Sequence, residues 1–132
     1  MKFLLLFLGL LFVILACSEN EDLYFTHLYG WVKSRIDSSG RNNMVLSVGD
    51  INPENPNQNR LRDTTSAYNS DSLPGFFEMD SVCFATSSRQ GSEIVGIAFD
   101  STKNSGWPTQ FQFFDLYGPV DTVIYYLSPY TE

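Results

Sequence analysis

The feature that most constrains this chain is a series of short apolar runs, each broken after a few residues by glycine, asparagine, serine or proline. Beyond the first 22 residues, no segment keeps the i, i+3, i+4, i+7 apolar spacing of an amphipathic helix for three turns. The runs are rich in Val, Ile, Phe, Tyr and Thr, and several alternate apolar with polar positions. This pattern predicts an all-β protein.

Seven strands are predicted, and their regular spacing favours a single β-sandwich of antiparallel strands over residues 26–132. In the first strand, Leu28, Gly30, Val32 and Ile36 are predicted to share the core face. One strand, 93–99, is apolar on both faces, which indicates a central position in its sheet. Another, 111–116, reads FQFFDL and changes phase at its centre, which indicates a β-bulge or an edge. The predicted strands are residues 26–36, 44–48, 75–79, 81–86, 93–99, 111–116 and 122–127.

Residues 50–72 are polar and rich in asparagine, and they are predicted as one long loop of functional or mobile character. Within it, Asp50, Asn52 and Glu54 alternate and offer the oxygen ligands that calcium prefers. The glycine and distal glutamate of an EF-hand loop are absent, however, and Asx residues are ordinary turn formers. Turn formation is therefore favoured over calcium, and no metal is assigned.

The N-terminus begins with Met1-Lys2, and residues 3–16 contain no charged or polar side chain. Fourteen apolar residues are too few for a membrane-spanning helix, which needs about 20, and fit the apolar region of a signal peptide. The run ends in Ile14-Leu15-Ala16-Cys17, which resembles the lipobox of bacterial lipoproteins. Leu15 is larger than the residue usual there.

The lipobox resemblance implies cleavage after residue 16, a diacylglyceryl group on Cys17 and further acylation of the new N-terminus. Several acyl chains make a stable membrane anchor where one does not. A plain secretory signal cleaved near Ala16, or an unmodified buried Cys17, are the alternatives. Residues 17–25 are then an acidic tether, and its SENED sequence resembles the surface-export signal of some lipoproteins. We expect an outer-membrane location, with the cell surface favoured over the periplasmic side.

Without residues 1–16, the chain has 116 residues, enough for one small domain. It carries 7 Lys and Arg against 15 Asp and Glu, a balance of −8, since only Lys2 is removed. This charge argues against nucleic acid and anionic lipid as partners. With Cys17 lipidated, Cys83 has no partner for an intrachain disulfide, and its apolar neighbours predict a buried thiol.

Residues 28–79 also resemble the carboxypeptidase-regulatory or transthyretin-like sandwich, a domain that many surface lipoproteins carry. The matching segments concern turns and core packing, so the resemblance implies no active site. Two extra residues before Asp37, no proline after Gly40 and the long 50–72 segment depart from the pattern. The segments are Gly30-Trp31-Val32, Asp37 to Gly40, Leu46-Ser47-Val48 and Gly75-Phe76-Phe77.

Signals for catalysis are sparse, and we expect a non-enzymatic protein with no cofactor. His27 is the only histidine, no nucleophile elbow accompanies it, and one histidine with one thiol does not favour zinc. Glu78 and Asp80 share one face of a strand and offer the two carboxylates that glycoside hydrolysis needs. The apolar neighbourhood of Cys83 would suppress its thiolate.

Aromatic residues are the most suggestive binding feature, with 17 of 20 following Cys17. Tyr and Trp present large contact areas with few rotatable bonds. We expect an adhesion or protein-interaction module. A glycan-binding module and a structural subunit that pairs through the edge of residues 111–116 are the alternatives. The binding candidates are Trp31, Trp107, Tyr117 and Tyr126.

Overall fold

The computed structural model describes residues 21–88 and 94–130 of the 132-residue chain. Those residues form seven β-strands and no helix, which confirms the predicted all-β class. The predicted signal peptide 1–16, Cys17 and the first residues of the tether lie outside the described residues. The strands are β1 (Leu23–Ser34), β2 (Val45–Ile51), β3 (Asn59–Thr65), β4 (Phe76–Thr86), β5 (Ile94–Phe99), β6 (Gln110–Asp115) and β7 (Val120–Leu127).

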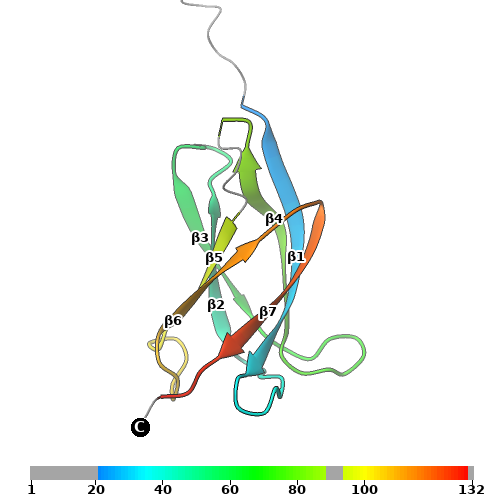
Figure 1. The fold of residues 1–132 in the computed structure, drawn as a ribbon, viewed down its shortest axis with the longest axis vertical. Helices are drawn as coiled ribbons and strands as arrows, with labels where there is room; N and C mark the ends of the chain where they lie inside the picture. Colours follow the sequence, from blue (N-terminus) through cyan, green and yellow to red (C-terminus); the bar gives the residue numbers. More distant parts are fainter. Residues whose placement is uncertain (1–20, 89–93, 131–132) are drawn as a thin grey trace, which may run out of the picture.

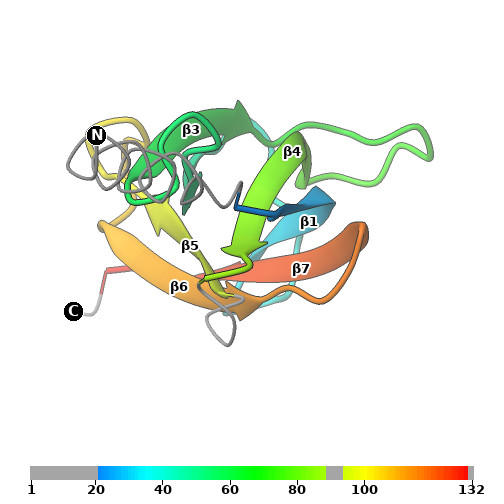
Figure 2. The same ribbon diagram turned by 90° about the horizontal axis from the view of Figure 1, so that it is seen from above.

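The strands form two sheets that pack face to face, a three-stranded sheet of order β4-β1-β7 and a four-stranded sheet of order β3-β2-β5-β6 (Figure 1). Seen along the long axis, β3 lies beside β4 and β6 beside β7 (Figure 2). The prediction of wholly antiparallel strands was wrong at one pair, because β1 and β7 are parallel. Parallel neighbours need a long crossover, and here the chain between β1 and β7 supplies it.

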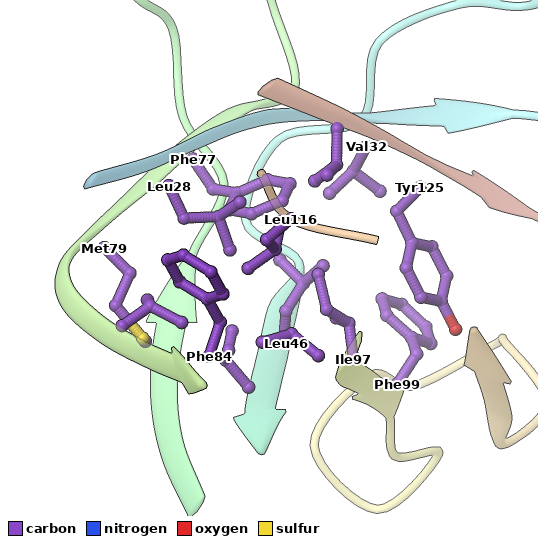
Figure 3. Close-up of a cluster of buried hydrophobic side chains, with 14 of the residues drawn as sticks. Leu28, Val32, Leu46, Phe77, Met79, Phe84, Ile97, Phe99, Leu116 and Tyr125 are labelled. Atoms are coloured by element: carbon purple, nitrogen blue, oxygen red, sulfur yellow. The ribbon is translucent and has the colours of Figure 1, made fainter. Parts of the chain in front are cut away.

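The core fills the space between the two sheets (Figure 3). Both sheets contribute apolar side chains at alternate positions, as a sandwich requires. The largest fully buried side chains come from β1, β2, β4, β5, β7 and the residue that follows β6: Leu28, Val32, Leu46, Val48, Phe77, Val82, Val95, Ile97, Phe99, Leu116, Tyr125 and Leu127.

β1 begins at Leu23, three residues before the predicted strand start, and it pairs with β4 from its first residue. Leu28, Gly30 and Val32 are buried on the predicted core face. Ile36 is not, because the strand has ended at Ser34 and its side chain is 75% exposed. The strand therefore turns away before its last predicted core residue.

β3 lies inside the segment predicted as a loop, so that prediction was wrong. Its register with β2 is regular over seven residue pairs from Val45↔Thr65 to Ile51↔Asn59. Leu61 is its only apolar side chain, and it points outward with 73% exposure. The strand has no apolar face toward the core, which is why apolar periodicity did not reveal it.

β4 is one strand where two were predicted. Between the pairs Thr26↔Val82 and Leu28↔Met79, β1 has one residue and β4 has two, which defines a β-bulge. Ser81 in the bulge has a positive φ of 54°. The bulge breaks the alternation of side chains, and this break caused the sequence to read as two strands.

β6 is an edge strand, as predicted, but it contains no bulge. Its six residues pair with β5 in unbroken register. Phe111 and Phe113 point outward, while Phe114 and Leu116 point toward the core. The apparent phase change in FQFFDL therefore reflects phenylalanine on both faces. The predicted central position of β5 is confirmed.

Side-chain hydrogen bonds join the two sheets along both sides of the sandwich. On one side, Gln112 Nε2 donates to the Tyr126 carbonyl (2.8 Å), and Gln110 exchanges hydrogen bonds with the backbone of Ser128 (2.7 and 2.8 Å). These bonds occupy carbonyls of the β7 segment that another strand would need in order to pair there.

On the other side, β3 side chains reach the backbone of β4. Arg60 and Arg62 each donate to the Ser81 carbonyl at 3.1 Å, and Thr64 donates to the Glu78 carbonyl at 3.0 Å. The bulge at Ser81 presents its carbonyl toward these arginines. The inward-facing polar side chains of β3 thus join the two sheets by hydrogen bonds, and we call this line of contacts between β3 and β4 the seam.

Candidate binding surfaces

The four aromatic residues predicted to bind a partner do not form one platform. Trp31 on β1 and Tyr126 on β7 lie on the outer face of the three-stranded sheet. Trp107 lies in the loop between β5 and β6 and packs against the core cluster. Tyr117 lies in the β6–β7 turn and is 77% exposed.

Two of these rings already have a cationic partner within the chain. The Arg35 guanidinium lies 5.9 Å from the ring centroid of Tyr126, and that of Arg41 lies 5.8 Å from Trp107. Cation–π contacts of this length are attractive. Tyr126 and Trp107 therefore each have one ring face engaged by an arginine.

Four exposed apolar side chains lie together on the outer face of the four-stranded sheet. Residues 111–116 were predicted as a pairing edge and not as an apolar face, although the alternation of phenylalanine with a polar residue in FQF indicates one. We call this surface the phenylalanine face. It consists of Leu61 (73% exposed), Phe113 (68%), Phe111 (54%) and Ile94 (49%), above Gly49 and Gly96.

Glycine forms the floor of the phenylalanine face. Gly49 on β2 pairs with Gly96 on β5, so the two central strands lack side chains at this level. The rings of Phe111 and Phe113 meet edge to face with centroids 4.6 Å apart, beside Gly96. Leu61 borders Gly49 from the opposite side. The rings of β6 and the side chain of Leu61 therefore lie over the two glycines.

A polar cluster borders the phenylalanine face at one end. Lys103 Nζ lies 2.8 Å from Asp63 Oδ2 and 3.2 Å from Ser47 Oγ, and Ser47 donates to Asp63 at 2.6 Å. The hydrogen bond from Lys103, followed by that from Ser47, lowers the pKa of Asp63. The apolar patch thus has a polar border, which is typical of protein interfaces.

The outer face of the three-stranded sheet carries a second cluster, which we call the acidic aromatic face. Tyr29 lies 4.2 Å from His27 and 6.1 Å from Phe76 between ring centroids, and Trp31 meets Phe76 edge to face at 5.5 Å. Two exposed carboxylates from β4 border the rings. The face consists of His27, Tyr29, Trp31, Phe76, Glu78 and Asp80.

The β4 bulge brings both carboxylates to the only histidine. Asp80 follows the last regular pair of the ladder and its carboxylate contacts His27 Nδ1. Glu78 Oε2 lies 3.5 Å from His27 Nε2. His27 is half-buried. The bulge thus groups one imidazole and two carboxylates beside the aromatic rings.

Asp50, the first calcium candidate, has a fully buried side chain and is bound by two arginines. Arg60 donates to both of its oxygens at 2.9 Å, and Arg62 Nη2 donates at 3.0 Å. The Cys83 N–H donates to the same carboxylate at 2.9 Å. The hydrogen bond that Arg60 donates to Asp50 raises the pKa of Arg60. Both oxygens of this carboxylate therefore have partners within the protein.

The other two calcium candidates lie in the β2–β3 connection. Asn52 Oδ1 accepts the backbone N–H of Glu54 at 3.1 Å, an Asx turn, and Glu54 is exposed. Within residues 21–88 and 94–130, no group of three or more His, Cys, Asp or Glu side chains is placed to hold a metal ion.

Cys83 is fully buried, as predicted, and desolvation raises the pKa of its thiol. A raised pKa disfavours the thiolate, which is the nucleophilic form. The described residues also contain no helix long and apolar enough to cross a membrane.

A scan against protein-family models finds no match to this chain, and searches of curated proteins and of solved structures find none either.

Proposed function

We propose that this protein is a lipid-anchored outer-membrane module that binds a protein partner, without catalysis, through the phenylalanine face. The observation that carries the proposal is the exposure of four large apolar side chains on one flat sheet face. Contiguous apolar surface with a polar border marks interaction sites on soluble domains. A partner would remove the rings of Phe111 and Phe113 from water.

The lipobox-like sequence supports anchorage through Cys17. β1 begins six residues after this cysteine, and six extended residues reach at most about 20 Å. A tether of this length would hold one end of the sandwich near the bilayer and leave both outer sheet faces accessible. The acidic tether supports the cell surface as the location.

We further propose that the sandwich is of the transthyretin-like kind. Three of the four segments that carry this resemblance are in contact with one another. Gly30 packs beneath the ring of Phe77, where an added Cβ would lie 2.3 Å from Cζ. A Cβ added at Gly75 would lie 3.0 Å from Gly40 Cα. These close approaches support the resemblance through core packing and turns.

The anchor is tested by metabolic labelling with radioactive palmitate. The wild-type chain should incorporate label, and Cys17→Ser should abolish it because the acceptor thiol is lost. Cys83→Ser is the matched control and should label like wild type. Equal labelling of Cys17→Ser and wild type would overturn the anchor.

The binding face is tested by a photo-crosslinking phenylalanine analogue at position 113 of the anchored protein in its native cells. It should give a discrete crosslinked protein, and Leu61→Ser on the same face should remove that product. An analogue at Asp71, an exposed loop position, is the matched control and should give no such product. Equal products from positions 113 and 71 would contradict the proposal.

The two alternative functions receive less support from the geometry. Pairing through the edge of residues 111–116 is supported only by the position of β6 at the edge of its sheet. A glycan platform built from the four predicted aromatic residues would require them to lie together, and they do not.

A further inference from the structure

The acidic aromatic face combines two kinds of group that attract cations. The faces of Tyr, Trp and Phe rings are electrostatically negative, and a carboxylate placed beside them adds a full negative charge. Tyr29, Trp31 and Phe76 form a continuous row of rings. Glu78 and Asp80 lie beside this row with side chains 58% and 80% exposed.

No lysine or arginine of the described residues neutralises the carboxylates or covers the rings of this face. Among the described residues, the two carboxylates form ion pairs with His27 only, and no arginine or lysine stacks on the three rings. Arg60 and Arg62 approach β4, but they donate to backbone carbonyls and to Asp50. By contrast, Tyr126 and Trp107 each have an arginine over the ring.

The charge of the whole molecule adds to this local field. With His27 counted as neutral, the chain has a net charge of −7 at pH 7. An acidic protein accelerates association with basic partners and disfavours acidic ones. The two exposed carboxylates of the face, which have no lysine or arginine partner among the described residues, are therefore complementary to a cationic partner and not to an anionic one.

We propose that the acidic aromatic face is a second binding surface, and that its ligand is a polypeptide segment bearing several lysine or arginine side chains. The alkyl stems and cationic ends of such side chains would lie over Tyr29 and Trp31 and pair with Glu78 and Asp80. This face lies on the opposite sheet from the phenylalanine face, so the two proposals stand independently.

The test uses the full chain in mild detergent and fluorescence anisotropy of labelled eight-residue peptides. The probe alternates lysine with threonine, and a peptide that alternates glutamate with threonine is its control. The lysine peptide should bind at least about ten-fold more tightly than the glutamate peptide, and added salt should weaken it. Equal affinities of the two peptides would overturn the proposal.

Two double variants separate the face from the net charge. Glu78→Gln with Asp80→Asn should weaken lysine-peptide binding about ten-fold or more. Glu54→Gln with Asp115→Asn removes the same charge elsewhere and should change it less than about two-fold. Equal losses in both variants would show attraction by net charge alone and refute a defined site.

The rings are tested separately, because an acidic site without them would bind through charge only. Trp31→Leu keeps an apolar side chain of the sheet face and should weaken lysine-peptide binding about five-fold, whereas Tyr117→Leu in the β6–β7 turn should not. Wild-type affinity of Trp31→Leu would refute the aromatic part. Binding of a neutral glucose hexasaccharide that survives Glu78→Gln with Asp80→Asn would replace the proposed ligand class by a glycan.

Discussion

A Cβ atom placed on Gly96 would lie 2.7 Å from Cζ of Phe111. The phenyl ring is therefore in close contact with the glycine of the neighbouring strand, in the way that aromatic residues shield glycine in sheets. Phe111 is nonetheless 54% exposed, since nothing described covers its outer side. The contact with Gly96 thus positions the Phe111 ring on the phenylalanine face while leaving its outer side exposed.

We predict that Gly96→Ala and Gly30→Ala differ sharply in stability. At Gly96 the collision is with the end of an exposed ring that can swing aside, so the cost should stay below about 1 kcal/mol. At Gly30 the added Cβ meets the buried Phe77 ring at 2.3 Å and the Val123 carbonyl at 2.9 Å, so the cost should exceed about 2 kcal/mol. Urea unfolding followed by tryptophan fluorescence measures both. Similar midpoints for the two variants would contradict this packing.

We predict that Asp50→Asn destabilises the fold by about 3 kcal/mol, because it removes the buried charge that pairs with Arg60 and Arg62. Asp63→Asn is the matched control, since its partner Lys103 is well exposed, and it should cost less than about 1 kcal/mol. The free energy of unfolding in urea tests both. Equal destabilisation would mean that the seam between β3 and β4 depends little on Asp50.

We predict that Tyr125→Phe is at least as stable as wild type at pH 7. The Tyr125 hydroxyl is buried and has no hydrogen-bond partner among the described residues (Figure 3). An unsatisfied buried hydroxyl carries a desolvation cost of roughly 1–3 kcal/mol, which phenylalanine avoids. A loss of more than about 1 kcal/mol in the variant would show that the hydroxyl is satisfied in solution.

The same residue predicts a loss of stability in alkali. Burial raises the pKa of Tyr125 from 10.0 to about 12, so the folded state retains a proton that the unfolded state releases. The free energy of unfolding is unaffected by this proton below pH 10. As the pH rises from about 10 to 12, the free energy of unfolding falls by about 2 to 3 kcal/mol. Between pH 9 and pH 11.5, the free energy of unfolding should fall more for wild type than for Tyr125→Phe. Parallel pH curves would contradict the linkage.

We predict that Cys83 resists alkylation in the folded protein. Its side chain is fully buried, and desolvation raises the pKa of its thiol, so little thiolate is accessible. Iodoacetamide at pH 8 should modify Cys83 at least about 100-fold more slowly in buffer than in 6 M guanidinium, as followed by intact mass. Comparable rates would show that the β1–β4 pairing opens readily.

The strands with an apolar inner face could be located from the sequence. The alternation of Val95, Ile97 and Phe99 predicted β5, and the apolar residues on its other face predicted its central position. β3 could not be found in this way, because its inward positions are Arg60, Arg62 and Thr64. The hydrogen-bond partners of those side chains are Asp50 and the β4 carbonyls, and only folding brings these partners close.

The candidate surfaces were less predictable than the fold. Trp31 was singled out, and Tyr29 shares its strand and face, but Phe76 belongs to β4, which pairs with β1 only after folding. The exposure of Phe111 and Phe113 depends on which side of an edge strand faces the core, and FQFF allows either choice. Single-strand patterns do not carry that information.

The sequence alone determined that the chain is β-rich, acidic and without an intrachain disulfide once Cys17 is used, because residue types decide propensity, charge and thiol count. The tertiary structure decided the parallel β1–β7 pair, the buried Asp50 cluster and the two exposed faces. These features rest on contacts between residues far apart in the chain, such as Gly49 with Gly96 and His27 with Asp80. The periodicity of a strand indicates which of its faces is apolar, but the residues that this face contacts are decided by the packing of the strands.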